Sequence, residues 1–64
     1  MKMAINGMYK GQVVVVDALK GMEAGIKVSV SQNDKLAICD LFPAEAVALA
    51  DALLGAVKYV TSKL

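Results

Sequence analysis

Residues 42–64 read FPAEAVALADALLGAVKYVTSKL, and this stretch carries the clearest periodic pattern of the chain. Pro43 suits the first position of a helix, because its fixed φ matches the helix and its missing N–H would be unpaired there. Glu45 then falls at the third helical position, from which its carboxylate can accept hydrogen bonds from free N–H groups of the first turn. We therefore predict a long C-terminal helix that begins at Pro43.

At about 100° per residue, one broad side of this helix is apolar and is predicted to be its core face. The residues on it are Ala46, Leu49, Ala50, Leu53, Ala56, Val57, Val60 and Leu64. Asp51, Lys58 and Ser62 form a narrow polar stripe on the far side.

A strip of small residues that ends in a tyrosine runs between the core face and the polar stripe, and it comprises Ala48, Ala52, Gly55, Ala56 and Tyr59. Small residues three or four apart allow a second helix backbone to approach closely, so this strip is the predicted oligomer interface. The alternative is that alanine is simply a good helix former that tolerates exposure.

The segment before the helix has the pattern of β-strands. Asn6-Gly7 suits a tight hairpin turn, which predicts a second strand from near Met8 with a break at Lys10-Gly11. Residues 13–16 are four consecutive valines, so both faces of that strand need a cover. Residues 26–31 alternate apolar and polar side chains, Asn33-Asp34 suits the next turn, and a last strand leads to the helix.

These elements predict a single α+β domain over residues 1–64. The expected fold is a three- or four-stranded antiparallel β-meander followed by one long C-terminal helix packed on the sheet.

The size of the chain favours self-association. A domain of 64 residues buries only about 60% of the surface that its unfolded chain exposes, and small domains therefore need extra stabilisation. Cys39 is the only cysteine and there is no histidine, so neither an intrachain disulfide nor a tetrahedral zinc site can provide it. Homo-oligomerisation is the remaining way to stabilise a domain of this size. Cys39 itself is predicted to be a small buried hydrophobe in a reducing, cytoplasmic setting.

Most kinds of functional chemistry are disfavoured by composition. Without histidine the commonest general base is missing, and no spacing forces two of the six acidic residues together, so we predict no enzyme and no cofactor. All seven positive side chains are lysines, which disfavours nucleic-acid recognition because arginine is the usual reader of phosphate and guanine. Asp51 in the middle of the apolar helix disfavours a membrane span.

One loop could bind a ligand. Residues 20–25 read KGMEAG, and backbone N–H groups together with the Lys20 ammonium could hold a small anion or a protein partner. The residues of this predicted site are Lys20, Gly21, Met22 and Glu23. The alternative is a plain connection between strands.

Two functional hypotheses remain, and no family resemblance separates them. The first is a small non-enzymatic homo-oligomer, such as a homodimer. It would be an accessory, inhibitory or sequestering factor of the phage or mobile-element type that docks on another macromolecule or holds a small ligand between subunits. The second is a structural or membrane-associated component whose apolar helix packs into a larger assembly.

Overall fold

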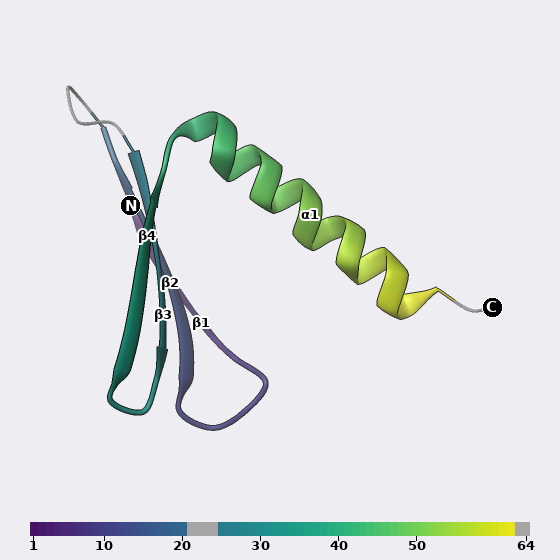
Figure 1. The fold of residues 1–64 in the computed structure, drawn as a ribbon, viewed down its shortest axis with the longest axis horizontal. Helices are drawn as coiled ribbons and strands as arrows, with labels where there is room; N and C mark the ends of the chain where they lie inside the picture. The colour runs from purple at the N-terminus through teal and green to yellow at the C-terminus, as the bar shows by residue number, and fades with distance from the viewer. Residues whose placement is uncertain (21–24, 63–64) are drawn as a thin grey trace.

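A computed structural model describes residues 1–20 and 25–62 of the chain (Figure 1). Four strands form one antiparallel sheet in the order of the sequence, and a single helix follows them. The predicted α+β fold, a meander followed by a C-terminal helix, is confirmed, with four strands. The elements are β1 (Lys2–Asn6), β2 (Gln12–Leu19), β3 (Gly25–Gln32), β4 (Lys35–Leu41) and α1 (Pro43–Thr61).

The connection between β1 and β2 is longer than predicted. Asn6-Gly7 does not form a two-residue turn, and the second strand begins at Gln12 rather than near Met8. The side chain of Gln12 explains the difference, because its Oε1 accepts a hydrogen bond from the N–H of Tyr9 at 3.1 Å. The main chain of Gln12 also accepts from the N–H of Gly7 at 2.8 Å, which closes the loop.

The connection between β3 and β4 is the two-residue turn that the sequence predicts. Asn33 adopts a φ of 57°, which asparagine tolerates better than most residues. The N–H of Asn33 donates to the carbonyl of Gly11 at 3.3 Å, so this turn is tied to the β1–β2 loop at the same end of the sheet.

The register divides the sheet into two unlike faces, because residues paired across strands point to the same side. One face carries a row of alternating charge: Lys2 pairs with Asp17, Asp17 with Lys27, and Lys27 with Asp40. This row crosses all four strands, and Ser29 and Ser31 lie on the same face. We call this side the charged sheet face.

The opposite side, which we call the apolar sheet face, has no charged side chain over three successive rows. Its residues are Met3, Ile5, Val14, Val16, Ala18, Ile26, Val28, Val30, Ala37, Cys39 and Leu41. Polar residues appear on this side only in the last row, at Gln12, Gln32 and Lys35.

Phe42 alone links the sheet to the helix. It is extended, with φ −70° and ψ 158°, which is the conformation that a following proline imposes. Its N–H donates to Oε1 of Glu45 at 2.9 Å, as predicted for the third helical position, and its carbonyl accepts from the N–H of Ala46 at 3.0 Å. These bonds and the proline ring fix the direction in which α1 leaves the sheet.

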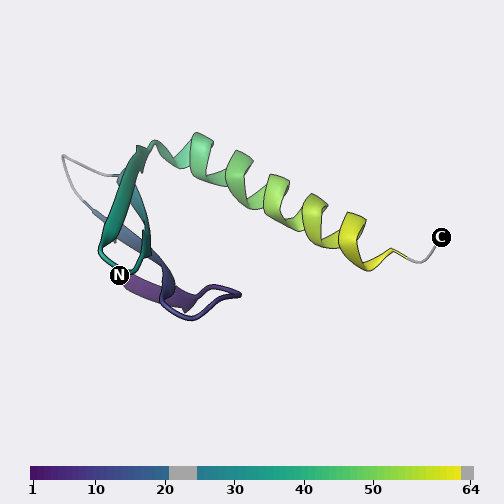
Figure 2. The same cartoon turned by 60° about the horizontal axis from the view of Figure 1, so that its bottom comes forward.

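α1 packs against β3 and β4 where it begins and then extends away from the sheet (Figures 1 and 2). The exposed fraction accordingly rises along its apolar side, from 40% at Leu49 to 78% at Val60. The predicted burial of this side is therefore wrong for the single chain, because the one-residue link directs the helix outward. Leu64, the last residue of that predicted face, lies outside the described residues.

The described part of the chain has no buried core. No side chain in residues 1–20 and 25–62 is fully buried, and the two inner strands, β2 and β3, are at best half-buried. Cys39 is exposed, so its prediction as a buried hydrophobe is also wrong. It sits on β4, an edge strand whose residues are exposed in the single chain except at Leu41, where the helix begins.

The overall dimensions agree with this open arrangement. The chain measures 47 × 30 × 16 Å, and its radius of gyration is 13.7 Å. A compact domain of this length has a radius of gyration of about 11 Å. The molecule is one sheet with a helical arm.

Candidate interaction surface

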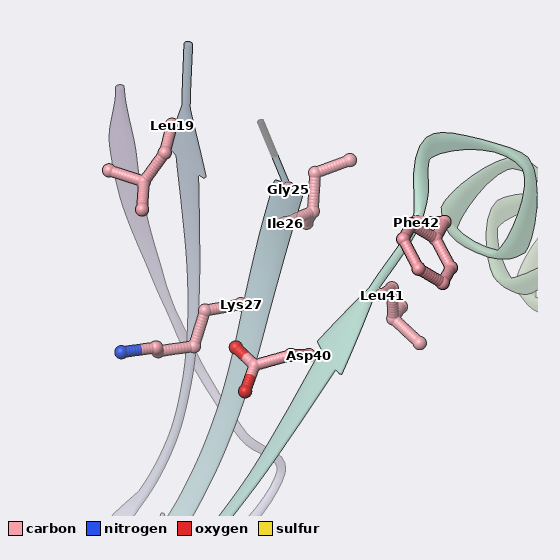
Figure 3. Close-up of a pocket in the computed structure, with 7 residues that line it drawn as sticks. All are labelled: Leu19, Gly25, Ile26, Lys27, Asp40, Leu41 and Phe42. Carbon is pink, nitrogen blue, oxygen red and sulfur yellow. The ribbon is translucent and has the colours of Figure 1, made fainter. Parts of the chain in front are cut away.

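Two apolar surfaces of the chain lie at an open angle to each other. The first is the apolar sheet face, and the second is the apolar helix side, which we define as Leu49, Leu53, Ala56, Val57 and Val60. Figure 3 shows Ile26 and Leu41 of the sheet pointing to the side from which α1 departs, whereas Lys27 and Asp40 point to the other side. The apolar sheet face is therefore the one that the helix overhangs.

The helix carries its own shallow apolar groove. Leu53, Ala56, Val57, Val60 and Thr61 line it. The hydroxyl of Thr61 donates to the carbonyl of Val57 at 2.7 Å, so the only polar side chain in the groove is satisfied within the helix. The groove is therefore an exposed apolar surface, which suits contact with another apolar surface.

A depression of about 360 Å³ lies where the helix joins the sheet (Figure 3). Its lining combines apolar side chains with one opposed pair of charges, and consists of Leu19, Gly25, Ile26, Lys27, Asp40, Leu41 and Phe42. Lys27 and Asp40 are register partners, so the local charge balances and gives an anion no net attraction. Its lining residues belong to both faces of the sheet, since the side chains of Lys27 and Asp40 point to one side and those of Ile26 and Leu41 to the other.

The predicted ligand loop falls mostly outside the described residues. Lys20 is described and exposed at the end of β2, whereas Gly21, Met22 and Glu23 lie in the segment that the structure does not describe. The anionic-ligand hypothesis therefore stays a prediction.

The predicted oligomer strip is exposed along its whole length. Ala48, Ala52, Gly55, Ala56 and Tyr59 all have open surroundings in the single chain, and a Cβ placed on Gly55 would meet nothing within 4 Å. The strip is available for a second helix. Its role as the interface stays a prediction.

No cluster of metal-binding side chains forms among the described residues. Nowhere in residues 1–20 and 25–62 do three or more His, Cys, Asp or Glu side chains come together. The Sγ of Cys39 lies 4.0 Å from the carbonyl of Asp40.

Within the described ranges, no helix combines the length and the apolarity that crossing a membrane requires.

No family model, no curated protein and no solved structure matches this chain.

Sequence reasoning found only part of the apolar sheet face, since the four valines of residues 13–16 indicate that both faces of one strand need a cover. The apolar side of the helix is easier to find, because its period shows within one continuous stretch. The sheet face is assembled from every second residue of four strands, and it appears only when the strands are aligned in register. The available signal was the charge pattern: placing Lys2, Asp17, Lys27 and Asp40 in one row puts the apolar residues together on the other side.

Proposed function

We propose that this chain is a non-enzymatic interaction protein that acts as a homo-oligomer. The observation that carries the proposal is the lack of a buried side chain in residues 1–20 and 25–62, together with the two apolar surfaces that the chain exposes. Surfaces of this kind on a small domain are typical of binding sites, because exposed apolar area in water favours association.

The finer role is that of an accessory, inhibitory or sequestering factor. In this role the oligomer docks on another macromolecule, or holds a small ligand in the depression lined by Ile26, Lys27 and Asp40. The opposite charges of Lys27 and Asp40, which are register partners, disfavour a free anion there.

The test is the molar mass of the tag-free protein by size-exclusion chromatography with light scattering, without detergent, over a hundredfold range of concentration. We expect a discrete species of two or more chains that dissociates on dilution. Its melting temperature should fall with protein concentration, because the apparent stability of an oligomer depends on the concentration of its subunits. A monomer with a concentration-independent melting temperature would contradict the proposal.

A second candidate is a component of a larger hetero-assembly, and the exposed helix favours it. In that case the purified chain aggregates without a defined mass, and a stable species forms only with the missing partner. The same light-scattering measurement separates this candidate from a closed homo-oligomer.

A further inference from the structure

We propose that two copies of this chain exchange their helices, so that the apolar helix side of each copy covers the apolar sheet face of the other. This inference rests on the proposed homo-oligomeric function and specifies which surfaces form the interface. Four features of the chain support it.

The first feature is the amount of surface that the single chain exposes. Its accessible surface is 5784 Å². A compact monomer of 6.7 kDa exposes about 3,900 Å², so the chain has roughly 1,900 Å² in excess. Obligate homodimers bury about 1,000 to 2,500 Å² on each partner. One second copy is therefore enough to account for the whole excess.

The second feature is the fit between the two surfaces. A helix of 19 residues is about 28 Å long, and strands of seven or eight residues span about 23 to 26 Å. One helix thus covers the sheet from end to end. The three apolar rows of the sheet carry no charge that a covering helix would leave unpaired.

The third feature is the link at Phe42, whose conformation directs the helix away from its own sheet. Closing the angle within one chain requires rotation about the backbone of Phe42, whose ψ of 158° is held by Pro43 and by the hydrogen bond to Glu45. A helix that is held off its own sheet by a short, stiff link is free to reach the sheet of a neighbour. Short hinges are a recognised cause of such exchange.

The fourth feature is that one chain carries both halves of the interface. In a two-fold symmetric pair each copy gives a helix and receives one, so both apolar surfaces of both copies are covered by a single symmetric contact. A helix-to-helix contact alone would leave the apolar sheet face in water.

The single native cysteine allows a direct test, because Cys39 lies on the apolar sheet face and is exposed in the single chain. One chain keeps Cys39. A second chain, made longer by a tag, carries Cys39→Ser and one new cysteine on the apolar helix side, at Leu49, Leu53 or Val57 in turn. The two chains are unfolded, mixed, refolded together and mildly oxidised. A disulfide between a tagged and an untagged chain then reports contact between a sheet and the helix of another copy, since a disulfide requires Cα atoms within about 7 Å.

We expect a mixed disulfide from at least one of the three positions. The matched control carries Cys39→Ser with Asp51→Cys, on the polar stripe opposite Leu53. We expect the yield of its mixed disulfide to be no higher than that of a chain with no added cysteine. Light scattering of the same unoxidised mixtures gives their mass.

The outcomes separate this inference from the proposed function. A dimeric mass with no mixed disulfide from any of the three positions would overturn the exchange and leave the homo-oligomer intact. A monomeric mass would overturn both. A chain that contains Cys39 and Leu53→Cys, and that forms its disulfide internally at monomeric mass, would show that the helix closes on its own sheet, which also overturns the exchange.

Discussion

Gly11 and Gly55 differ in backbone conformation and in the space around them. Gly11 has a φ of +87°, and a Cβ added there would lie 2.9 Å from Oδ1 of Asn33. Gly55 is inside α1, and a Cβ added there would meet nothing within 4 Å. The same substitution should therefore change stability in opposite directions at the two positions.

We expect Gly11→Ala to lower the free energy of unfolding by about 1 to 2 kcal/mol, because a side chain is strained at positive φ and Asn33 crowds it. Urea denaturation at a fixed protein concentration measures the change. A variant as stable as the native chain would show that the loop relaxes without cost.

We expect Gly55→Ala to raise the free energy of unfolding by about 0.8 to 1 kcal/mol, through helix propensity, at an unchanged molar mass. In the exchanged dimer Gly55 lies on the side of α1 away from the sheet contact. If Gly55→Ala instead loses stability in a way that grows on dilution, the strip from Ala48 to Tyr59 is where two helices meet, because the added methyl would push their backbones apart.

Single residues were predicted well where a local backbone rule applies. Glu45 accepts the N–H of Phe42 because its spacing from Pro43 leaves little choice, and Asn33 takes the positive φ of its turn. The burial of Cys39 was predicted wrongly, because burial depends on which element covers a strand. A strand pattern does not contain that information.

Among the elements, the row of alternating charge across the four strands favours the observed strand register. Each of its cross-strand pairs joins opposite charges, and slipping a strand by two residues would break those pairs. Lys27 is central to the row, because it lies between Asp17 and Asp40.

We expect Lys27→Glu to lower the free energy of unfolding by about 0.5 to 2 kcal/mol, since it replaces two attractive pairs with two repulsive ones. Lys35→Glu is the matched control, because Lys35 pairs with the uncharged Gln32. Thermal melts of both variants at low and at about 1 M salt measure the effect, and the difference between them should shrink at high salt. Equal shifts for the two variants at low salt would argue against the charge row.

The link between β4 and α1 should decide the state of association. We expect insertion of Gly-Gly between Phe42 and Pro43 to give a monomer, because Phe42 then no longer precedes proline and the two added glycines let the helix turn back onto its own sheet. The measurement is molar mass by light scattering, with the same insertion after Ser62 as the control. A variant that keeps the native mass would show that the stiffness of the link is not what holds the helix away.

The order and type of the elements were predictable because the periods of strands and helices differ. The direction of α1 was not, because it depends on the ψ of one residue. Pro43 marks the start of the helix in the sequence, whereas its effect on Phe42, which directs the helix away from the sheet, is seen only in the structure.

At the scale of the whole molecule, the two faces of the sheet should respond differently to an added charge. Cys39 and Ile38 are neighbours on the edge strand β4, both are exposed in the single chain, and they point to opposite faces. In a single chain, lysine at either position reaches water. In the exchanged dimer only position 39 is covered.

We therefore expect Cys39→Lys to shift the molar mass to that of the monomer, because the partner helix would have to desolvate the ammonium group. Ile38→Lys, on the charged sheet face, should keep the native mass. Light scattering and the dependence of the melting temperature on dilution check both variants. Dissociation of Ile38→Lys alone would place the interface on the charged sheet face.

Of the two apolar surfaces, only the one on the helix was fully predictable from the sequence. The apolar helix side was found from its period, and self-association was expected from the small size of the chain. A need for a cover on the sheet was expected from the valines of residues 13–16. The extent of the apolar sheet face was not, because it appears only after four strands with sequence separations of up to several tens of residues are aligned.

The meander order of the strands has a consequence for the speed of folding. Every strand pairs with its neighbour in sequence, so the sheet has low contact order, and its hairpins can form one after another while the rest of the chain is still unfolded. The helix comes after the strands, and in an exchanged pair its docking is an encounter between two molecules. Refolding should therefore show a fast phase whose rate is independent of protein concentration, followed by a slower phase whose rate increases with it. Stopped-flow circular dichroism at several concentrations would resolve the two.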